Sequence, residues 1–299
     1  MPLYLGLDCG GSSSRAMLLD SQGRIAFVGK SGPANIATTP RPYLAMSLKR
    51  ALEGCSKPDY VCGCFAGLVS EEYKQILGRM LEGFLPGAKI EIYPDYYAVF
   101  SAALDPKGCC VISGTGSMVC SKVGKELKKS GGGGLLIGDE GSAFSIGRSA
   151  LKTYIQSSSE EISDTLQEAV IEIFGVEQPG EILAKVYRDL NPAARIALLA
   201  QSIAKDWDRE YPYAKEIVAY EMEALAKVVT RHLKRYHQED MQKTIYIAGG
   251  LWEISPIFQE VFTEYCQKLY PFYQGKTQKI AKLPVYGAAL LAKDMNHEY

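Results

Sequence analysis

Residues 8–13 form the first group in the chain whose types and spacing could do chemistry. An apolar stretch, residues 3–7, leads into Asp8 and Cys9 and then into Gly10, Gly11, Ser12 and Ser13. Small residues let backbone N–H groups approach an anion closely, hydroxyl groups add donors, and a carboxylate can hold a hydrated Mg²⁺ ion. A tight hairpin capped by Asp8 would use the same residue types. The segment is therefore a candidate phosphate and magnesium site, with an ordinary turn as the alternative.

A second turn of the same kind lies between apolar residues 109–113 and residues 118–123. Its residues are Gly114, Thr115, Gly116 and Ser117. A dinucleotide-binding loop would need a third glycine and a helix directly after it, and the sequence has neither. Two similar turns between paired strands indicate an internal duplication, whose two copies we expect to enclose a cleft.

Two acids follow strands or lie in turns. Asp95 comes after the apolar stretch 89–93, and Asp139 lies in the polar turn 138–142. Phosphoryl transfer to a hydroxyl group needs positioning, charge neutralisation and one carboxylate that accepts the proton. Asp95 could instead be a helix N-cap, and Asp139 could be a cap or a turn acid before Ser142, because Asp is common at such positions. Taken one at a time, the two acids leave both interpretations open.

The elements that must hold these residues alternate between strands and helices. In the first half the patterns predict strands at 3–8, 15–19, 24–28, 60–66 and 89–93, with helices at 42–53 and 70–82. Strands restart at 109–113 and 118–123, the chain is then mostly helical from 142 to 237, and a strand at 244–248 and helices at 256–270 and 285–296 follow. The second half therefore contains a helical insert.

Composition limits the classes of function. The chain has 299 residues, a formal net charge of -1 and 22% charged residues, so about two domains are expected and no basic surface for nucleic acid. No apolar run approaches the ~20 residues of a membrane helix, and no leader pattern precedes the first strand. The eight cysteines lack the spacing of a metal site, and we expect free, mostly buried thiols. These features predict a cytoplasmic protein that acts on small molecules without a nucleic-acid or membrane partner.

Three motifs, in this order, resemble those of the BadF/BadG/BcrA/BcrD ATPases, and especially their N-acetylglucosamine kinase branch within the superfamily of sugar kinases, heat-shock ATPases and actin. They are Leu-Asp-Cys-Gly-Gly-Ser at 7–12, Ile-Ser-Gly-Thr-Gly-Ser at 112–117 and Gly-Asp-Glu-Gly-Ser-Ala at 138–143. The resemblance implies an α/β protein with the two-domain, actin-like ATPase (ribonuclease H-like) fold, in which duplicated βββαβαβα domains surround a cleft. The implied domains are 1–112, with a C-terminal helix at about 286–299 packing back on it, and 113–285.

The same resemblance implies roles for individual residues. Asp8 would lie near Mg²⁺, and the ATP-binding residues would be Gly10, Gly11, Ser12, Ser13, Gly114, Thr115, Gly116, Ser117, Gly249 and Gly250. Asp95 would be the catalytic base, and the sugar would be contacted by Asn35, Asp95, Gly133 and Asp139. The implied reaction transfers the γ-phosphate of ATP to a hydroxyl group, O6, of an amino sugar such as N-acetylglucosamine or N-acetylmuramic acid. The resemblance is compatible with a homodimer.

Two departures from the family pattern bear on the substrate. N-acetylglucosamine kinases of this family carry a Trp where this chain has Gly133, and a small residue usually follows the catalytic Asp where this chain has Tyr96 and Tyr97. We therefore expect a reshaped sugar pocket, with N-acetylmuramic acid as the substrate and glucosamine as the alternative.

Two other classes of protein compete with the kinase interpretation. A dehydratase-activating ATPase has a similar fold but needs cysteines that bind an iron–sulfur cluster between two subunits, and this sequence has no matching cysteine setting. A sugar-binding regulator without catalysis would need a DNA-binding module, and no helix-turn-helix precedes Leu3.

Overall fold

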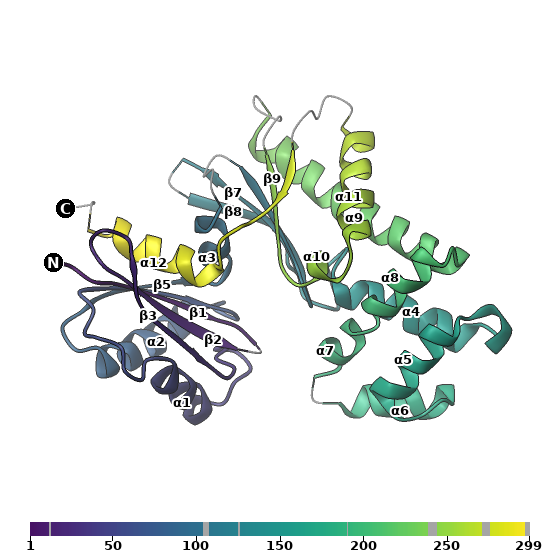
Figure 1. Ribbon diagram of the computed structural model, residues 1–299, viewed down its shortest axis with the longest axis horizontal. Helices are drawn as coiled ribbons and strands as arrows, with labels where there is room; N and C mark the ends of the chain where they lie inside the picture. Colours follow the sequence, from purple (N-terminus) through teal and green to yellow (C-terminus); the bar gives the residue numbers. More distant parts are fainter. Residues whose placement is uncertain are drawn as a thin grey trace. The chain divides into compact units, whose positions relative to one another are not determined.

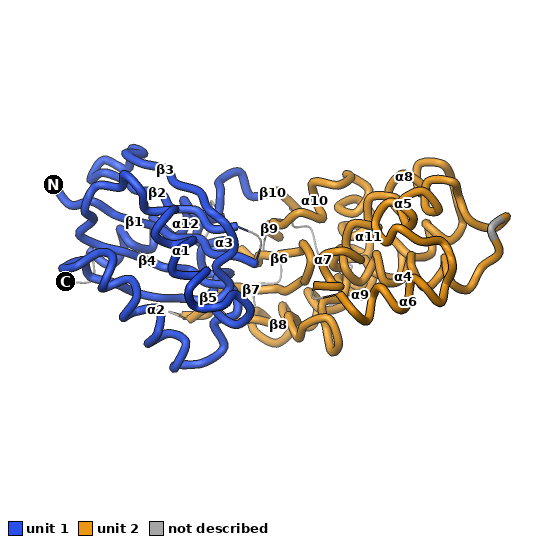
Figure 2. Tube along the Cα trace, turned by 90° about the horizontal axis from the view of Figure 1, so that it is seen from below, with its two compact units in different colours: residues 1–106, 280–299 blue, residues 107–279 orange. Residues whose placement is uncertain are grey.

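The computed structural model describes residues 1–11, 13–103, 108–124, 126–189, 191–238, 244–270 and 276–296. The chain forms two compact units (Figure 2). Unit 1 comprises residues 1–106 and 280–299, and unit 2 comprises residues 107–279. The division lies before strand β6 (Cys109–Ser113), whereas the expected domain boundary at 112 lay within it. The difference arises because, in the described part of the chain, β6 pairs with β7 and β9, which both belong to unit 2.

Unit 1 is built on a five-stranded sheet with the order β3-β2-β1-β4-β5. Its strands are β1 (Tyr4–Cys9), β2 (Ser14–Leu19), β3 (Ile25–Ser31), β4 (Tyr60–Phe65) and β5 (Lys89–Pro94). The first three are antiparallel, and β4 and β5 continue the sheet parallel to β1. The crossover helices are α1 (Arg41–Ala51) and α2 (Glu71–Phe84). Because β1, β4 and β5 run in the same direction, the residues that follow them gather at one edge of the sheet.

Both faces of this sheet are covered because the strands carry apolar side chains on both sides. On one face, Leu5 and Leu7 belong to the core shared with α1 and α2. The opposite face packs against α12 (Pro284–Asp294), the last helix of the chain (Figure 1). Gly6 permits this contact, since a Cβ atom there would lie 2.2 Å from the backbone nitrogen of Ala289. The last helix is therefore a layer of the first unit.

Unit 2 repeats the same sheet, with the order β10-β9-β6-β7-β8. Besides β6, its strands are β7 (Ser117–Val123), β8 (Glu126–Gly131), β9 (Ile245–Ala248) and β10 (Thr277–Lys279). Three antiparallel strands are again extended by two parallel ones, so the predicted α/β fold with an internal duplication is confirmed. The sequence patterns did not predict β8 and β10, which are both edge strands. The first carries three charged residues among six, and the second is only three residues long.

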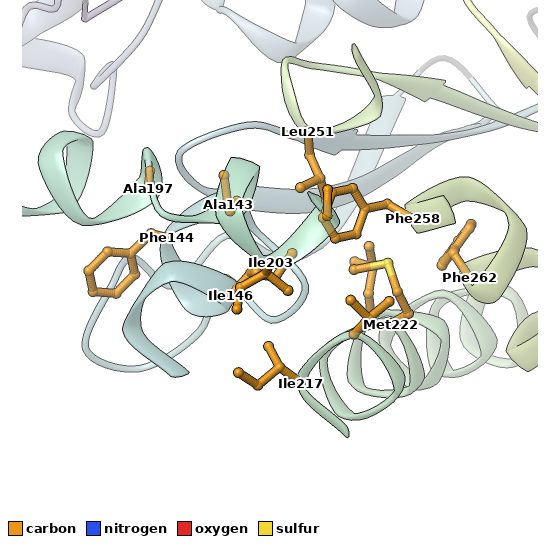
Figure 3. Close-up of a cluster of buried hydrophobic side chains, with 14 of the residues drawn as sticks. Ala143, Phe144, Ile146, Ala197, Ile203, Ile217, Met222, Leu251, Phe258 and Phe262 are labelled. Atoms are coloured by element: carbon orange, nitrogen blue, oxygen red, sulfur yellow. The ribbon is translucent and has the colours of Figure 1, made fainter. Parts of the chain in front are cut away.

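Between β8 and β9 the chain is helical. The helices are α4 (Ala143–Gln156), α5 (Asp164–Phe174), α6 (Pro179–Arg188), α7 (Pro192–Ala197), α8 (Ala200–Asp208) and α9 (Pro212–Tyr236), with a 3₁₀ turn at Ser159–Glu161. After β9 come α10 (Leu251–Ile254) and α11 (Pro256–Leu269). Figure 3 shows how Ile146, Ile203, Met222 and Phe258, from four of these helices, meet in one buried cluster. Helix α9 is therefore packed firmly into the core of unit 2.

The cysteines are all free, and all except Cys55 are buried, as the sequence predicted. In unit 1 the short helix α3 (Tyr96–Ser101) follows β5. Within the described parts of the chain, no helix has the length and apolar character required to span a bilayer.

A buried polar cluster joins α9 to β7 and β8. His232 is only 1% exposed, and its ring nitrogens lie 2.7 Å from the Ser121 hydroxyl and 2.8 Å from the Ser130 hydroxyl. The Nε2 atom of His237 lies 2.6 Å from the same Ser121 hydroxyl. Burial, and the neighbouring His237, lower the pKa of His232 to about 4. The ring is therefore neutral near pH 7.

This cluster makes the stability of unit 2 depend on pH. Between its ordinary pKa of 6.5 and about 4, His232 binds a proton in the unfolded chain but not in the folded one. Stabilisation is therefore complete above pH 6.5 and decreases as pH falls towards about 4, by at most ~3 kcal/mol. Both tryptophans, Trp207 and Trp252, lie in unit 2, so denaturant unfolding followed by their fluorescence reports on this unit.

We expect His232→Asn to flatten the pH dependence of unfolding between pH 4 and 6.5. The control is Thr230→Val, which removes a hydrogen bond from the same helix without removing a titrating group and should leave the dependence unchanged. Equal slopes in wild type and His232→Asn would contradict this assignment.

Candidate active site

Asp8 and Asp95 interact at the edge of the unit 1 sheet where β1, β4 and β5 end. Burial raises the pKa of Asp8, the positive charge of Arg15 lowers it and the negative charge of Asp95 raises it, and together they bring the pKa to about 6. Arg15 lies directly across the β1–β2 hairpin from Asp8. The structure thus brings together the expected metal ligand and the expected catalytic base.

Asp95 is held by the sheet and by the helix that follows it. Its backbone N–H donates to the carbonyl oxygen of Phe65 at 3.1 Å, and its Oδ1 atom accepts the N–H of Tyr96 at 3.0 Å. Asp95 is therefore the N-cap of α3, as the alternative interpretation required. Because Phe65 pairs with both Cys9 and Pro94, strand register places this carboxylate beside the end of β1.

The first glycine turn is open around its glycines. The N–H of Gly10 donates to the carbonyl oxygen of Ser13 at 2.9 Å, which closes the turn. A Cβ atom on Gly11 would meet nothing within 4 Å, and one on Gly10 would be 3.4 Å from the nearest atom. Neither glycine has a positive φ. Packing does not require glycine here, whereas close approach of a phosphate would; Ser12 lies outside the described residues.

Asn35 lies at the same edge, in the loop after β3. Its Oδ1 atom accepts the N–H groups of Ala37 at 2.9 Å and Thr38 at 3.2 Å, and among the described residues its amide nitrogen has no partner. Gly67, which follows β4, has a φ of 75°, and a Cβ atom there would lie 2.2 Å from the Asn35 Oδ1 atom. The amide nitrogen is therefore the group that could donate to a ligand.

In unit 2, the β6–β7 turn meets the turn after β9. The N–H of Gly114 donates to the carbonyl oxygen of Gly116 at 2.9 Å. A Cβ atom on Gly114 would lie 3.6 Å from the nitrogen of Gly250, and one on Gly249 would lie 2.2 Å from the carbonyl oxygen of Ser113. With its φ of 105°, Gly249 can be replaced only with strain. The expected nucleotide residues of this unit therefore lie together, with Thr115 exposed at the tip.

Asp139 is held against this turn in a left-handed conformation, with φ at 64°. Its carboxylate accepts the backbone N–H groups of Ser117 and Gly134, which lower its pKa, but burial raises the pKa by more. A Cβ atom on Gly116 would lie 2.8 Å from an oxygen of this carboxylate, so Gly116 makes room for it. The N-cap of α4 is Ser142, so Asp139 is not the cap. It is instead the turn acid before Ser142 that the other alternative described, since the Ser142 N–H donates to its carbonyl oxygen at 3.2 Å.

Gly133 lies in the exposed loop before Asp139. Its φ is not positive, and a Cβ atom there would be 3.4 Å from the nitrogen of Gly138, the nearest atom. The backbone therefore does not by itself require glycine at this position. Leu136 and Ile137, in the same loop, are 88% and 86% exposed.

The two units hold their candidate sugar-binding loops in the same way. In unit 1, Ser14 begins β2 and its hydroxyl donates to the carbonyl oxygen of Gly32 at 2.9 Å. In unit 2, Ser117 begins β7 and its hydroxyl donates to the carbonyl oxygen of Glu140 at 2.6 Å. The first glycine of each turn also accepts a backbone N–H from the loop, namely Ala34 to Gly10 and Ala143 to Gly114. Ser14 ends the first glycine-serine segment but was not among the expected site residues, although its position matches that of Ser117 in the duplication.

Comparison with known proteins identifies the family. The profile of the BadF/BadG/BcrA/BcrD ATPase family matches residues 5–292. The chain belongs to this family. Over 98% of its length it is 23% identical to the N-acetylmuramic acid/N-acetylglucosamine kinase of Clostridium acetobutylicum, 99% of which is covered. Over 49% of its length it is 32% identical to a glucosamine kinase of Vibrio cholerae, 52% of which is covered.

Solved structures agree with this BadF/BadG/BcrA/BcrD assignment at the level of the fold. A Porphyromonas gingivalis protein assigned as an N-acetylglucosamine kinase superposes with a TM-score of 0.74 at 21% identity, covering 99% of this chain and all of the other. A ROK family glucokinase from Streptomyces griseus, bound to glucose and AMPPNP, gives a TM-score of 0.61 at 14% identity, with 98% and 99% of the two chains covered. The actin-like sugar kinase fold predicted from the motifs is confirmed.

Asp8 fits the Mg²⁺ that accompanies ATP in an ATPase of this family. Burial and Asp95 both favour the neutral form of its carboxyl group, and a cation would favour the charged form. Carboxylates are also the ligands that Mg²⁺ prefers, usually one or two together with water and substrate phosphates.

The electrostatic coupling of Asp8 and Asp95 can be measured without any ligand. We expect Asp95→Asn to lower the pKa of Asp8 from about 6, because it removes a negative charge, and Arg15→Met to raise it. The measurement is a ¹³C NMR titration of the Asp8 carboxyl carbon in metal-free protein. Glu82→Gln, on the exposed side of α2, is the control and should have no effect. An Asp8 pKa that is unchanged or raised in Asp95→Asn would show that the two acids are not coupled in this way.

Proposed function

We propose that this protein is an ATP-dependent kinase that transfers the γ-phosphate of ATP to a hydroxyl group of an amino sugar. The observation that carries the proposal is the coupling of Asp8 and Asp95 beside an open glycine turn. Phosphoryl transfer needs one carboxylate near the metal and another that accepts a proton. Support also comes from the Clostridium acetobutylicum kinase, which is similar along almost the whole chain.

In this reaction, different residues of the chain would bind ATP, hold the metal ion and accept the proton. Backbone N–H groups of the turns at Gly10 and Gly114 bind phosphate oxygens, Gly249 and Gly250 border the adenosine, and Asp8 holds the metal through water. Mg²⁺, when bound, neutralises charge on the phosphates. Asp95 accepts the proton as the sugar hydroxyl oxygen bonds to the γ-phosphorus and the bond to the β–γ bridging oxygen breaks, releasing ADP.

The proposed acceptor is O6 of N-acetylmuramic acid or N-acetylglucosamine. Asn35 offers an amide nitrogen and Asp139 a carboxylate, which suit the oxygen and hydroxyl groups of a sugar. With Gly133 in place of a Trp there is more room for a substituent, which favours the larger N-acetylmuramic acid. Glucosamine remains the second candidate, because a glucosamine kinase is 32% identical over half of the chain.

The distribution of thiols argues against an iron–sulfur ATPase. A cluster between two subunits needs cysteines at the surface, but all the cysteines except Cys55 are buried. Cys62 and Cys64, whose sulfur atoms are 3.9 Å apart, lie in the core beneath α12. Cys55 alone cannot supply a set of cluster ligands.

Replacing Asp95 by Asn separates the catalytic role from the capping role. Asn keeps an Oδ1 acceptor for the Tyr96 N–H but cannot take up the proton, so kcat should fall ~100- to 10,000-fold. The KM values for sugar and ATP, and the melting temperature, should stay near those of wild type.

The assay is sugar-dependent ADP release with N-acetylmuramic acid and N-acetylglucosamine. Ser70→Ala removes the N-cap of α2 and serves as a control, which should lose stability but keep its turnover. A stable Asp95→Asn variant with normal kcat would eliminate Asp95 as the base.

A further inference from the structure

Glu221 is a buried acid in the middle of α9, 2% exposed, at a position where the helix faces the core of unit 2. Its Oε2 atom accepts the backbone N–H of Gly141 at 3.2 Å, and its Oε1 atom accepts the hydroxyl of Ser149 at 3.0 Å. Both donors are neutral, and among the described residues no cation pairs with this carboxyl group. Burying an acid against two neutral donors costs free energy. We therefore expect the hydrogen bonds to these two donors to have a role in the site.

The Gly141 N–H belongs to the loop that carries Asp139. On one side, the hydroxyl groups of Ser113 and Ser117 fix the carbonyl oxygens of Gly141 and Glu140, at 2.8 Å and 2.6 Å. On the other side the loop rests on α9, where a Cβ atom on Gly141 would lie 2.6 Å from the Cβ atom of Leu225. The loop is therefore held between the β6–β7 turn and Glu221.

Asp139 depends on this support because its own backbone conformation is unfavourable. A non-glycine residue with φ at 64° stays there only when the surrounding contacts impose it. The contacts that bear on the loop from α9 are the side chain of Glu221 and the close packing at Gly141. Without the Glu221 side chain, the buried N–H of Gly141 has lost this acceptor, and the loop can relax.

We propose that Glu221 is a positioning residue, which holds the loop of residues 139–142 so that the Asp139 carboxylate keeps its place for the sugar. The proposal rests on the proposed kinase function. Glu221 should affect the affinity for sugar and not that for ATP. The hydroxyl bonds of Ser113 and Ser117 would keep the β6–β7 turn, the expected nucleotide site, in place without Glu221. A purely structural role would instead affect only stability.

Three substitutions of Glu221 distinguish these roles. Glu221→Gln can still accept the Gly141 N–H and can donate to the Ser149 hydroxyl, so it should behave like wild type. Glu221→Met keeps the volume but offers no acceptor, and Glu221→Asp draws the carboxylate back by one methylene group. For the last two we expect the KM for sugar to rise about tenfold, equivalent to one lost hydrogen bond to a buried group, with the KM for ATP nearly unchanged.

The control is Thr230→Val, which removes the Thr230 hydroxyl bond to the carbonyl oxygen of Ala226 on the same helix. It should lower the melting temperature without changing either KM. A second readout needs no sugar, namely a ¹³C NMR titration of the Asp139 carboxyl group. Displacement of the loop changes both the burial that raises this pKa and the N–H groups of Ser117 and Gly134 that lower it, so Glu221→Met should move the titration away from its wild-type position.

The outcomes separate the two claims. If wild-type protein phosphorylates no sugar, the proposed function fails, while the Asp139 titration still tests the positioning role. If Glu221→Met and Glu221→Asp match Thr230→Val in sugar KM and leave the Asp139 titration at its wild-type position, Glu221 is not a positioning residue. Normal sugar KM in Glu221→Gln together with a raised value in Glu221→Met supports the proposal.

Discussion

The parallel pairing of β1 with β4, and of β4 with β5, is the interaction on which the candidate site of unit 1 depends. In this register Asp8 lies opposite Cys64, and Phe65 pairs with both Cys9 and Pro94. The residues that follow each strand therefore reach the same edge, where Asp95 affects the pKa of Asp8. A slip of one residue would turn the side chains of a strand to its other face and separate these groups.

The duplicated fold uses this edge differently in its two copies. In unit 1 one acid, Asp8, lies in β1 and the other, Asp95, directly follows β5, and an amide is supplied by the loop after β3. In unit 2 the corresponding loop supplies an acid, Asp139, and is fixed by serine hydroxyls on one side and by Glu221 on the other. The shared device is a serine at the start of the second strand, Ser14 or Ser117, which ties the loop to the glycine turn.

Much of the fold could be predicted from the sequence because the strands of unit 1 are apolar and are separated by clear turns. The β6–β7 turn revealed the duplication for the same reason. Strand β8 could not be predicted, since its side chains are charged and partly exposed and its strand character comes from pairing with β7. The boundary between the two units depends on which sheet β6 joins. The local sequence around β6 predicts a strand but does not indicate its partner strands.

The expected site residues were found through motifs, whereas their supports were not. Glu221 lies in a helix with many exposed charges, and only the tertiary structure distinguishes it from them by placing it beside Gly141. Gly67 had a weak signal, a glycine directly after a strand, but its role depends on the approach of Asn35 from another loop. Such contacts are set by packing between segments far apart in the chain, so sequence spacing does not reveal them.

Identification of the product shows whether this chain phosphorylates an amino sugar. Purified protein would be incubated with ATP, Mg²⁺ and one sugar at a time, N-acetylmuramic acid, N-acetylglucosamine, glucosamine or glucose, and followed by ³¹P NMR. We expect a new phosphomonoester signal coupled to the C6 protons of the sugar, formed fastest with a 2-acetamido sugar. Release of inorganic phosphate without a sugar ester, or faster reaction with glucose than with every amino sugar, would contradict it.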